Sequence, residues 1–108
     1  MVCITRELRR AYYSCVSYTD AQIGCVIKEL EIQGVSDDTI IVLLADHGWQ
    51  FGEHNEWCKI TNFEDATHVP FLLHVPSITD IDGGTKTQGF VELIDIFPTL
   101  AELADLSS

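Results

Sequence analysis

Basic residues are scarce in this sequence. Lys and Arg total 6 against 17 Asp and Glu, which gives a formal net charge of -11. Such a balance disfavours a general nucleic-acid surface or an anionic membrane surface, because both partners repel an acidic protein. The sequence also lacks the run of about 18 apolar residues that crosses a bilayer, and residues 1–10 lack the apolar stretch of a signal peptide. An anionic substrate would need a local cation.

Closely paired cysteines are absent as well. Cys3, Cys15, Cys25 and Cys58 form no CxxC motif, so neither a closely spaced zinc site nor a dense disulfide framework is expected. We interpret these residues as mostly free or buried thiols. The 108 residues fit one domain, but a chain of this size buries only about two thirds of its unfolded surface. The sequence therefore describes a small domain or a piece of a larger one.

Two segments carry helical periodicity. Apolar residues recur at helical spacing from about residue 6 to residue 33, and Gly34 is placed to end that helix. A second apolar stripe runs from Leu93 to Leu106 through Pro98, so this helix is expected to begin or kink near the proline.

Two further segments are predicted as strands. Residues 39–45 and 69–75 are apolar and rich in branched side chains. A helix, strand, long loop, strand, helix order predicts an α/β layer with a buried parallel strand pair. Two strands and two helices do not cover both faces of such a sheet, so we interpret the chain as a fragment of a larger α/β protein or as an oligomer.

The segment from Asp46 to Lys59 carries most of the chemical groups. It combines carboxylates, imidazoles and an ammonium group, and it directly follows the apolar run Ile40–Ala45. Open α/β sheets place their ligand sites at the carboxyl ends of strands. Residues 46–67 form a connection that is long for a compact domain, and such loops are usually functional.

Asp46 and His47 are candidate metal ligands. A carboxylate at a strand end is a hard oxygen donor suited to a hard cation, although an Asx turn or a helix cap is the ordinary alternative. An imidazole favours zinc or manganese more than calcium. The alternative for His47 is a turn histidine that donates to a backbone carbonyl.

The other polar residues have weaker functional interpretations. Lys59 could be a solvated loop lysine, and Trp49 could anchor the loop, a role that we assign to Trp57. The remaining residues have default interpretations. We expect solvated carboxylates at Glu53 and Glu56, a solvated helix face at Arg9 and Arg10, and packing side chains at Tyr12, Tyr13 and Tyr18. We expect hydrogen bonds to neighbouring groups to satisfy the histidines His54, His68 and His74.

Several ordered motifs resemble the sulfatase branch of the alkaline phosphatase superfamily. They cover nearly the whole chain and are the segments Arg9–Asp20, Thr39–Val42, Ala45–Trp49, Gly52–Lys59, Ala66–Pro70 and Phe97–Leu100. This resemblance implies that Asp46 and His47 ligate a divalent metal, usually calcium, that Lys59 contacts the sulfate group, and that Trp49 belongs to the substrate pocket. A cation facing the transferred group can contribute about 3 kcal/mol in a dry pocket.

The resemblance also implies that part of the catalytic machinery is missing. Sulfatases oxidise the cysteine of a Cys-X-Pro-Ser-Arg motif to formylglycine, the nucleophile, and none of the four cysteines here lies in that motif. Residues 1–108 are thus expected to be a fragment of a sulfatase catalytic domain that lacks the nucleophile-bearing N-terminal part. The formylglycine would lie upstream, and this chain alone should be inactive without the remainder of the domain.

The implied activity is hydrolysis of sulfate esters, on a uronic acid of a glycosaminoglycan. The implied location of the parent protein is lysosomal or secreted. Two alternatives are a metal-dependent phosphodiesterase or phosphonate hydrolase of the same superfamily, and a noncatalytic α/β fragment.

Overall fold

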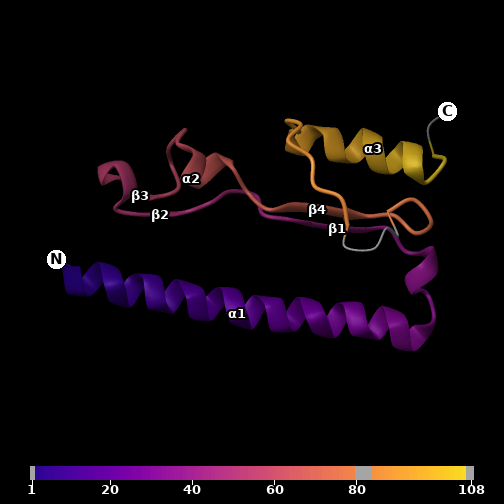
Figure 1. Ribbon diagram of the computed structural model, residues 1–108, viewed down its shortest axis with the longest axis horizontal. Coiled ribbons are helices and arrows are strands. Elements are labelled where there is room, and N and C mark those ends of the chain that lie inside the picture. The colour runs from indigo at the N-terminus through magenta and orange to yellow at the C-terminus, as the bar shows by residue number, and fades with distance from the viewer. Residues whose placement is uncertain (1, 80–83, 107–108) are drawn as a thin grey trace.

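The computed structural model of the chain describes residues 2–79 and 84–106. Two small sheets lie between a long helix on one side and two shorter helices on the other (Figure 1). The elements in chain order are α1 (Val2–Gln33), a 3-10 turn (Ser36–Asp38), β1 (Ile41–Leu44), β2 (Gln50–Phe51), a 3-10 turn (Glu53–Asn55), β3 (Trp57–Cys58), α2 (Glu64–Thr67), β4 (Phe71–His74), a 3-10 turn (Leu93–Asp95) and α3 (Ile96–Leu103). The fold is thus a mixture of helices and strands, as predicted.

Helix α1 confirms the predicted long helix and begins four residues earlier than expected. It ends at Gly34, whose φ of +68° favours glycine because a side chain is strained there. The Val35 N–H donates to the Leu30 carbonyl at 3.1 Å, as in the usual glycine-terminated helix end. Within residues 2–79 and 84–106, no helix is both long and apolar enough to span a membrane.

The prediction of a buried parallel strand pair was wrong. Strands β1 and β4 pair antiparallel, with Ile41 opposite His74 and Leu44 opposite Phe71. A parallel pair requires a crossover that returns the chain to the starting edge, usually a helix, and α2 is only one turn long. The pair is also only half covered, because Leu44, Phe71 and Leu72 are exposed.

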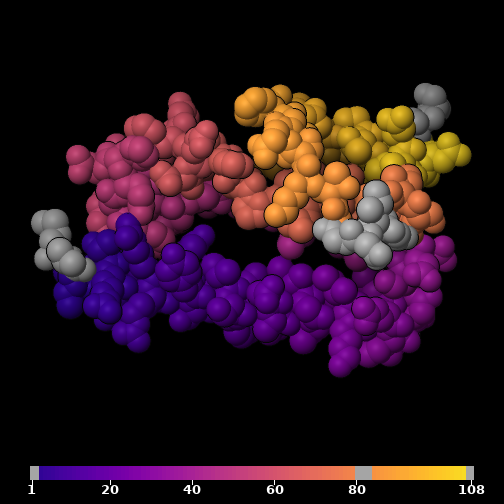
Figure 2. All heavy atoms as spheres, in the orientation of Figure 1, coloured from indigo at the N-terminus to yellow at the C-terminus, as the bar shows by residue number. Residues whose placement is uncertain are grey.

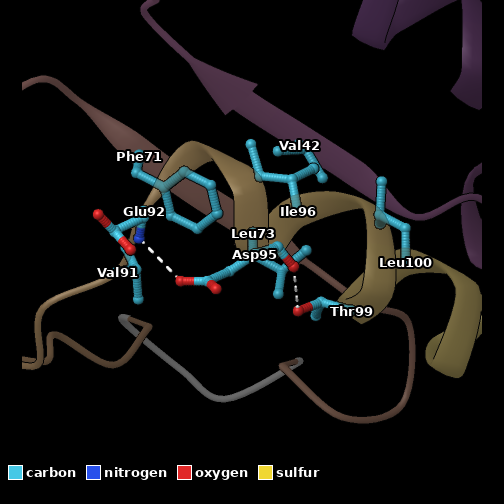
Figure 3. A pocket seen from close by; sticks show the side chains of 9 residues that line it. All are labelled: Val42, Phe71, Leu73, Val91, Glu92, Asp95, Ile96, Thr99 and Leu100. Carbon is cyan, nitrogen blue, oxygen red and sulfur yellow. Dashed lines mark hydrogen bonds between the residues drawn. The ribbon is translucent and has the colours of Figure 1, made fainter.

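The C-terminal helix packs on this sheet. Pro98 is the third residue of α3, where the backbone N–H has no partner within the helix, so the predicted start near the proline is confirmed. Asp95 and Glu92 form a capping box, in which the Glu92 N–H donates to Asp95 Oδ2 at 2.8 Å. A cavity of about 150 Å³ lies between helix and sheet. Figure 3 shows the apolar side chains of β1, β4 and α3 that line it.

Most of the apolar surface remains uncovered. The chain exposes 9282 Å², compared with roughly 6,000 Å² for a folded monomer of its 12.1 kDa. Its radius of gyration is 17.3 Å, whereas roughly 13 Å is typical of a compact domain of this length. Figure 2 shows α1 standing apart from the other elements over its middle. Among the described residues only Gln50, Ala66 and Val75 are buried.

The four cysteines are free and exposed. The prediction of free thiols is confirmed, and the alternative of buried thiols is not.

Candidate active site

The candidate site lies where β1 ends. Asp46 and His47 follow β1 after Ala45, and Lys59 follows β3 directly. The β2–β3 hairpin, with Phe51 opposite Trp57, turns the chain back so that Lys59 returns to the end of β1. The structure thus brings together Asp46, His47 and Lys59, which lie within thirteen positions of one another in the sequence.

Hydrogen bonds fix the imidazole of His47. Its Nδ1 lies 3.0 Å from the Gly48 carbonyl oxygen, which can only accept, so Nδ1 carries the proton. The other ring nitrogen, Nε2, is left with a lone pair. Second-shell contacts of this kind orient histidines that bind metals through the opposite nitrogen. The turn-histidine alternative is also realised in this contact, and the two roles are compatible.

Asp46 and Lys59 both face that lone pair. Asp46 Oδ2 lies 3.3 Å from His47 Nε2, while its Oδ1 accepts a hydrogen bond from the His47 backbone N–H at 3.0 Å. Lys59 Nζ lies 2.5 Å from the same Nε2 and donates to it. A carboxylate, a neutral imidazole and an ammonium therefore converge on one point, with the cation of Lys59 held by the lone pair.

The donors of Asp46 and His47 fit a shared divalent cation. Two ligand atoms that each lie about 2.2 Å from one ion, at about a right angle, are about 3.1 Å apart. The observed separation is 3.3 Å. The Asp46 side chain is 80% exposed and that of His47 is 32% exposed, so both are accessible. Within the described part of the chain no third His, Cys, Asp or Glu completes a metal-binding group. The described residues thus offer two candidate ligands, Asp46 and His47.

Gly48 holds this turn against α2. Its N–H donates to the Ala66 carbonyl at 2.8 Å, and a Cβ at this position would lie 2.0 Å from the Asp65 carbonyl oxygen. No side chain fits at that distance. The absence of a Cβ lets the backbone next to His47 approach α2, where Ala66 is buried.

The hairpin that carries Lys59 contains strained backbone. Left-handed φ values occur at Gly52 (+102°), His54 (+55°), Asn55 (+61°) and Cys58 (+74°). Such conformations cost about 1–3 kcal/mol at non-glycine residues and cluster at functional sites. His54 is held by stacking on Phe63, with ring centroids 4.1 Å apart, and its Nε2 lies 3.3 Å from Asp65 Oδ2.

An ion pair attaches this hairpin to α1. Arg9 donates to Glu53 Oε1, and the Phe51 N–H donates to Glu53 Oε2 at 2.5 Å. The edge of the Tyr12 ring also meets the Phe51 ring at a centroid distance of 5.1 Å. The expectation of a solvated Glu53 was wrong, because Glu53 is partly buried and pairs with a residue 44 positions away. Arg9 remains exposed, as expected, although it carries this ion pair. Packing of Tyr12 is confirmed, whereas Tyr13 and Tyr18 are largely exposed.

The ionisation of Glu53 should affect stability. The Phe51 backbone N–H, then the backbone N–H of Glu53 itself and the Arg9 guanidinium, lower the pKa of the Glu53 carboxyl. A carboxylate whose pKa is lower in the folded chain stabilises the fold above its ordinary pKa, and this contribution is lost as the pH falls through the lowered value. We expect the free energy of unfolding to fall below about pH 4, and Glu53→Gln to remove part of that dependence.

Chemical denaturation at pH 7 and pH 3, with an NMR titration of the carboxyl groups, measures this effect. Glu56→Gln is the matched control, because Glu56 is exposed in the same hairpin. A titration midpoint for Glu53 at or above the ordinary value of a glutamate would contradict the prediction.

The two tryptophans lie on the hairpin rather than in a core. Trp49 is 39% exposed and lies beside Phe51, with ring centroids 6.3 Å apart. The ring of Trp57 lies over Gly52, and a Cβ added to Gly52 would be 3.5 Å from it. Trp57 is 46% exposed. Both rings therefore remain available to a ligand, and the role predicted for Trp49 stays a prediction.

Three features of the site are absent from the sequence predictions. They are the Arg9–Glu53 pair, the close approach at Gly48 and the buried Gln50. The Nε2 of Gln50 donates to the Glu53 carbonyl at 3.4 Å, and its Oε1 has no hydrogen-bond partner within the described structure. Only the glycine left a local signal, since it directly follows the candidate ligands. The other two depend on distant pairing and burial.

Comparison with known proteins identifies relatives over nearly the whole chain. A family model described as Sulfatase matches residues 2–106. Iduronate 2-sulfatase of Mus musculus is 39% identical to this chain, over 94% of the chain and 22% of the relative. Choline-sulfatase of Rhizobium meliloti is 37% identical, over 94% of this chain and 19% of the relative. Arylsulfatase K of Bos taurus is 32% identical, over 94% of this chain and 18% of the relative. The chain thus spans about a fifth of the length of the curated relatives it matches.

Proposed function

We propose that this chain, which belongs to the sulfatase family, is part of a catalytic domain that hydrolyses sulfate esters, to which it contributes two metal ligands and a sulfate-contacting lysine. The observation that carries the proposal is the convergence of Asp46, His47 and Lys59 on one point, with Asp46 Oδ2 3.3 Å and Lys59 Nζ 2.5 Å from His47 Nε2. Family membership supports the reaction class, and this geometry supports the residue roles.

The residues have distinct roles in the proposed reaction. Asp46 and His47 Nε2 would hold a divalent cation, with calcium the expected ion, and the cation would polarise the sulfate oxygens. The Gly48 carbonyl keeps the proton of His47 on Nδ1. The lone pair of Nε2, which accepts from Lys59 in this structure, would then bind the cation, and Lys59 would be released toward the sulfate group. Lys59 would place a positive charge where negative charge develops on the transferred group, and it lies next to a hairpin that contains left-handed backbone. Trp49 offers a flat apolar face to a sugar ring.

The uncovered surface supports a chain that functions within a larger domain. About half as much surface again is exposed as in a compact monomer of this mass. Large apolar side chains on both outer helices are among the exposed residues, including Val16, Val26 and Phe97. Because the chain has no Cys-X-Pro-Ser-Arg motif, the nucleophile would come from the remainder of the domain, and the chain alone should not turn over substrate.

A substrate and a location can be proposed at finer detail. Similarity to iduronate 2-sulfatase supports a sulfate ester on a uronic acid of a glycosaminoglycan as the substrate, and a lysosomal or secreted parent protein. Because choline-sulfatase and arylsulfatase K are similar to the chain as well, the activity test includes a sulfate ester other than a sulfated uronic acid.

A chimaera tests the proposal. The matching segment of mouse iduronate 2-sulfatase is replaced by this chain, and hydrolysis of a sulfated uronic-acid disaccharide, an aryl sulfate and a bis-aryl phosphate is measured. We expect the folded chimaera to hydrolyse the sulfate esters, Asp46→Asn to abolish that activity, and the isolated chain to be inactive.

Three outcomes would contradict the proposal. A folded chimaera that prefers the phosphodiester would favour the phosphodiesterase alternative, and a folded chimaera without any activity would favour a noncatalytic fragment. Turnover by the isolated chain would show that the nucleophile is not missing.

A further inference from the structure

A second, positively charged cleft lies between the N-terminal end of α1 and the β2–β3 hairpin. These two segments lie side by side in Figure 1. The cleft has a volume of about 640 Å³, within the range of about 300–1,000 Å³ that is typical of small-molecule sites. It shares no lining residue with the site of Asp46, His47 and Lys59. Its lining combines guanidinium groups with aromatic rings, chiefly Arg6, Arg9, Arg10, Tyr13, Phe51 and Trp57.

The charge of this cleft contrasts with the rest of the chain. Three of the six basic residues line it, in a protein whose net charge is -11. No Asp or Glu is among the residues that line it in the described structure. The cleft therefore segregates positive charge from an otherwise acidic surface, which favours an anionic ligand.

The arrangement of the arginines is unfavourable for the helix itself. Arg6 precedes Arg9 by three positions and Arg10 by four, and like charges at these spacings repel on a helix. They also lie near the N-terminus of α1, where the helix dipole disfavours cations, and the first turn contains no acidic residue. Glu53 compensates Arg9, and the exposed Glu7 compensates Arg10 only weakly, so an external anion would add compensation at Arg6 and Arg10.

Two of the three guanidinium groups can reach a ligand. Arg9 is paired with Glu53, and that pair holds the hairpin. Arg10 makes an exposed contact with Glu7 at 3.6 Å, a kind of pair that contributes little. Arg6 forms no salt bridge within the described residues. A planar guanidinium binds sulfate or carboxylate through two parallel hydrogen bonds, so Arg6 and Arg10 are suited to such groups.

Aromatic rings beside these cations indicate a ligand with an apolar face. Tyr13 is 68% exposed and Trp57 is 46% exposed, and both line the cleft. Rings of this type offer a rigid apolar surface against which a sugar can pack. We propose that the cleft binds a short acidic oligosaccharide, with its sulfate or carboxylate groups on Arg6 and Arg10 and a sugar ring on Trp57. Binding here does not depend on the proposed hydrolytic site.

NMR titration of the 108-residue chain tests this proposal. The probes are a sulfated uronic-acid disaccharide, its desulfated form, a neutral disaccharide, inorganic sulfate and a four-nucleotide single strand of DNA. We expect the sulfated disaccharide to shift the Trp57 indole N–H and the Arg6 and Arg10 signals, the desulfated form to bind more weakly through its carboxylate, and the neutral sugar to cause no shift.

Variants locate the binding. The double substitution Arg6→Gln and Arg10→Gln should weaken binding at least tenfold. The matched control, Lys28→Gln, removes a charge from the same helix about 33 Å away and should change affinity less than twofold. Lys59→Gln should leave the Trp57 shift unchanged, which separates this cleft from the hydrolytic site.

The outcomes that would overturn the proposal are distinct. An equal loss in Lys28→Gln would show general charge attraction, and a shift with inorganic sulfate alone would show anion binding without sugar recognition. Binding of the oligonucleotide at least as tightly as the sulfated disaccharide would assign the cleft to nucleic acid. The double variant should be at least as stable as the unmodified chain, because it removes charge repulsion in α1. A variant that loses binding but keeps this stability therefore supports the proposal.

Discussion

Gly48→Ala is expected to destabilise the chain by about 3 kcal/mol and to disrupt the candidate metal site. The added methyl group would lie 2.0 Å from the Asp65 carbonyl oxygen, so the backbone between β1 and β2 must move away from α2. That movement breaks the hydrogen bond from the Gly48 N–H to the Ala66 carbonyl, and it displaces the Gly48 carbonyl that orients His47. Chemical denaturation and the NMR signals of the His47 ring measure the two effects.

Gly24→Ala is the matched control for this substitution. Gly24 lies inside α1, and a Cβ there would have no neighbour within 4 Å. Alanine is the better helix former by about 1 kcal/mol, so this variant should be more stable than the unmodified chain. A Gly48→Ala variant with unchanged stability and an unchanged His47 tautomer would contradict the expected close approach.

Lys59→Gln should lower kcat of the chimaera about 100-fold. In the proposed reaction the Lys59 ammonium, which lies 2.5 Å from His47 Nε2, would turn to the sulfate group and stabilise the charge that develops there. Removing one such preorganised group costs about 3 kcal/mol of transition-state stabilisation. Lys59→Arg keeps the charge but changes its shape, and it should recover part of the activity.

Steady-state kinetics on a sulfated uronic-acid disaccharide separate binding from chemistry. Because the proposed interaction strengthens in the transition state, kcat should fall more than KM rises. Lys28→Gln, at an exposed position of α1, is the control and should leave both parameters unchanged. A rise in KM alone would show that Lys59 only binds the ground state.

The elements with strong local signals could be predicted from the sequence. The apolar stripe and Gly34 placed α1 and its end, and Pro98 placed the start of α3. The apolar run Ile40–Ala45 predicted β1, with Asp46 just beyond it. These features depend on residues within a few positions of each other, where periodicity and backbone restrictions act directly.

The strand direction could not be predicted in the same way. Parallel pairing was inferred from the order of helices and strands, but that order does not determine strand direction unless a crossover helix connects the two strands. Direction depends on the connection, and residues 46–67 contain a two-stranded hairpin and a single helical turn instead of a crossover helix. Neither the hairpin nor the short helix has a long periodic pattern.

The candidate site was accessible to sequence analysis for a chemical reason. Asp46, His47 and Lys59 lie in one polar segment after a strand, and the fold does bring them together. The Arg9–Glu53 pair joins elements 44 positions apart, and the cleft at Arg6 and Arg10 exists only because α1 meets the hairpin. Long-range contacts of this kind leave no signal in a single sequence.

The most direct measurement of the shared cation site is paramagnetic broadening by Mn²⁺ in NMR spectra of the 108-residue chain. We predict that substoichiometric Mn²⁺ broadens the signals of Asp46 and His47 first and those of Lys59 next. Asp46→Asn should abolish the effect, and the control Asp37→Asn, at an exposed carboxylate, should not. Broadening that is centred elsewhere in the chain, or that persists in Asp46→Asn, would contradict a metal held by Asp46 and His47.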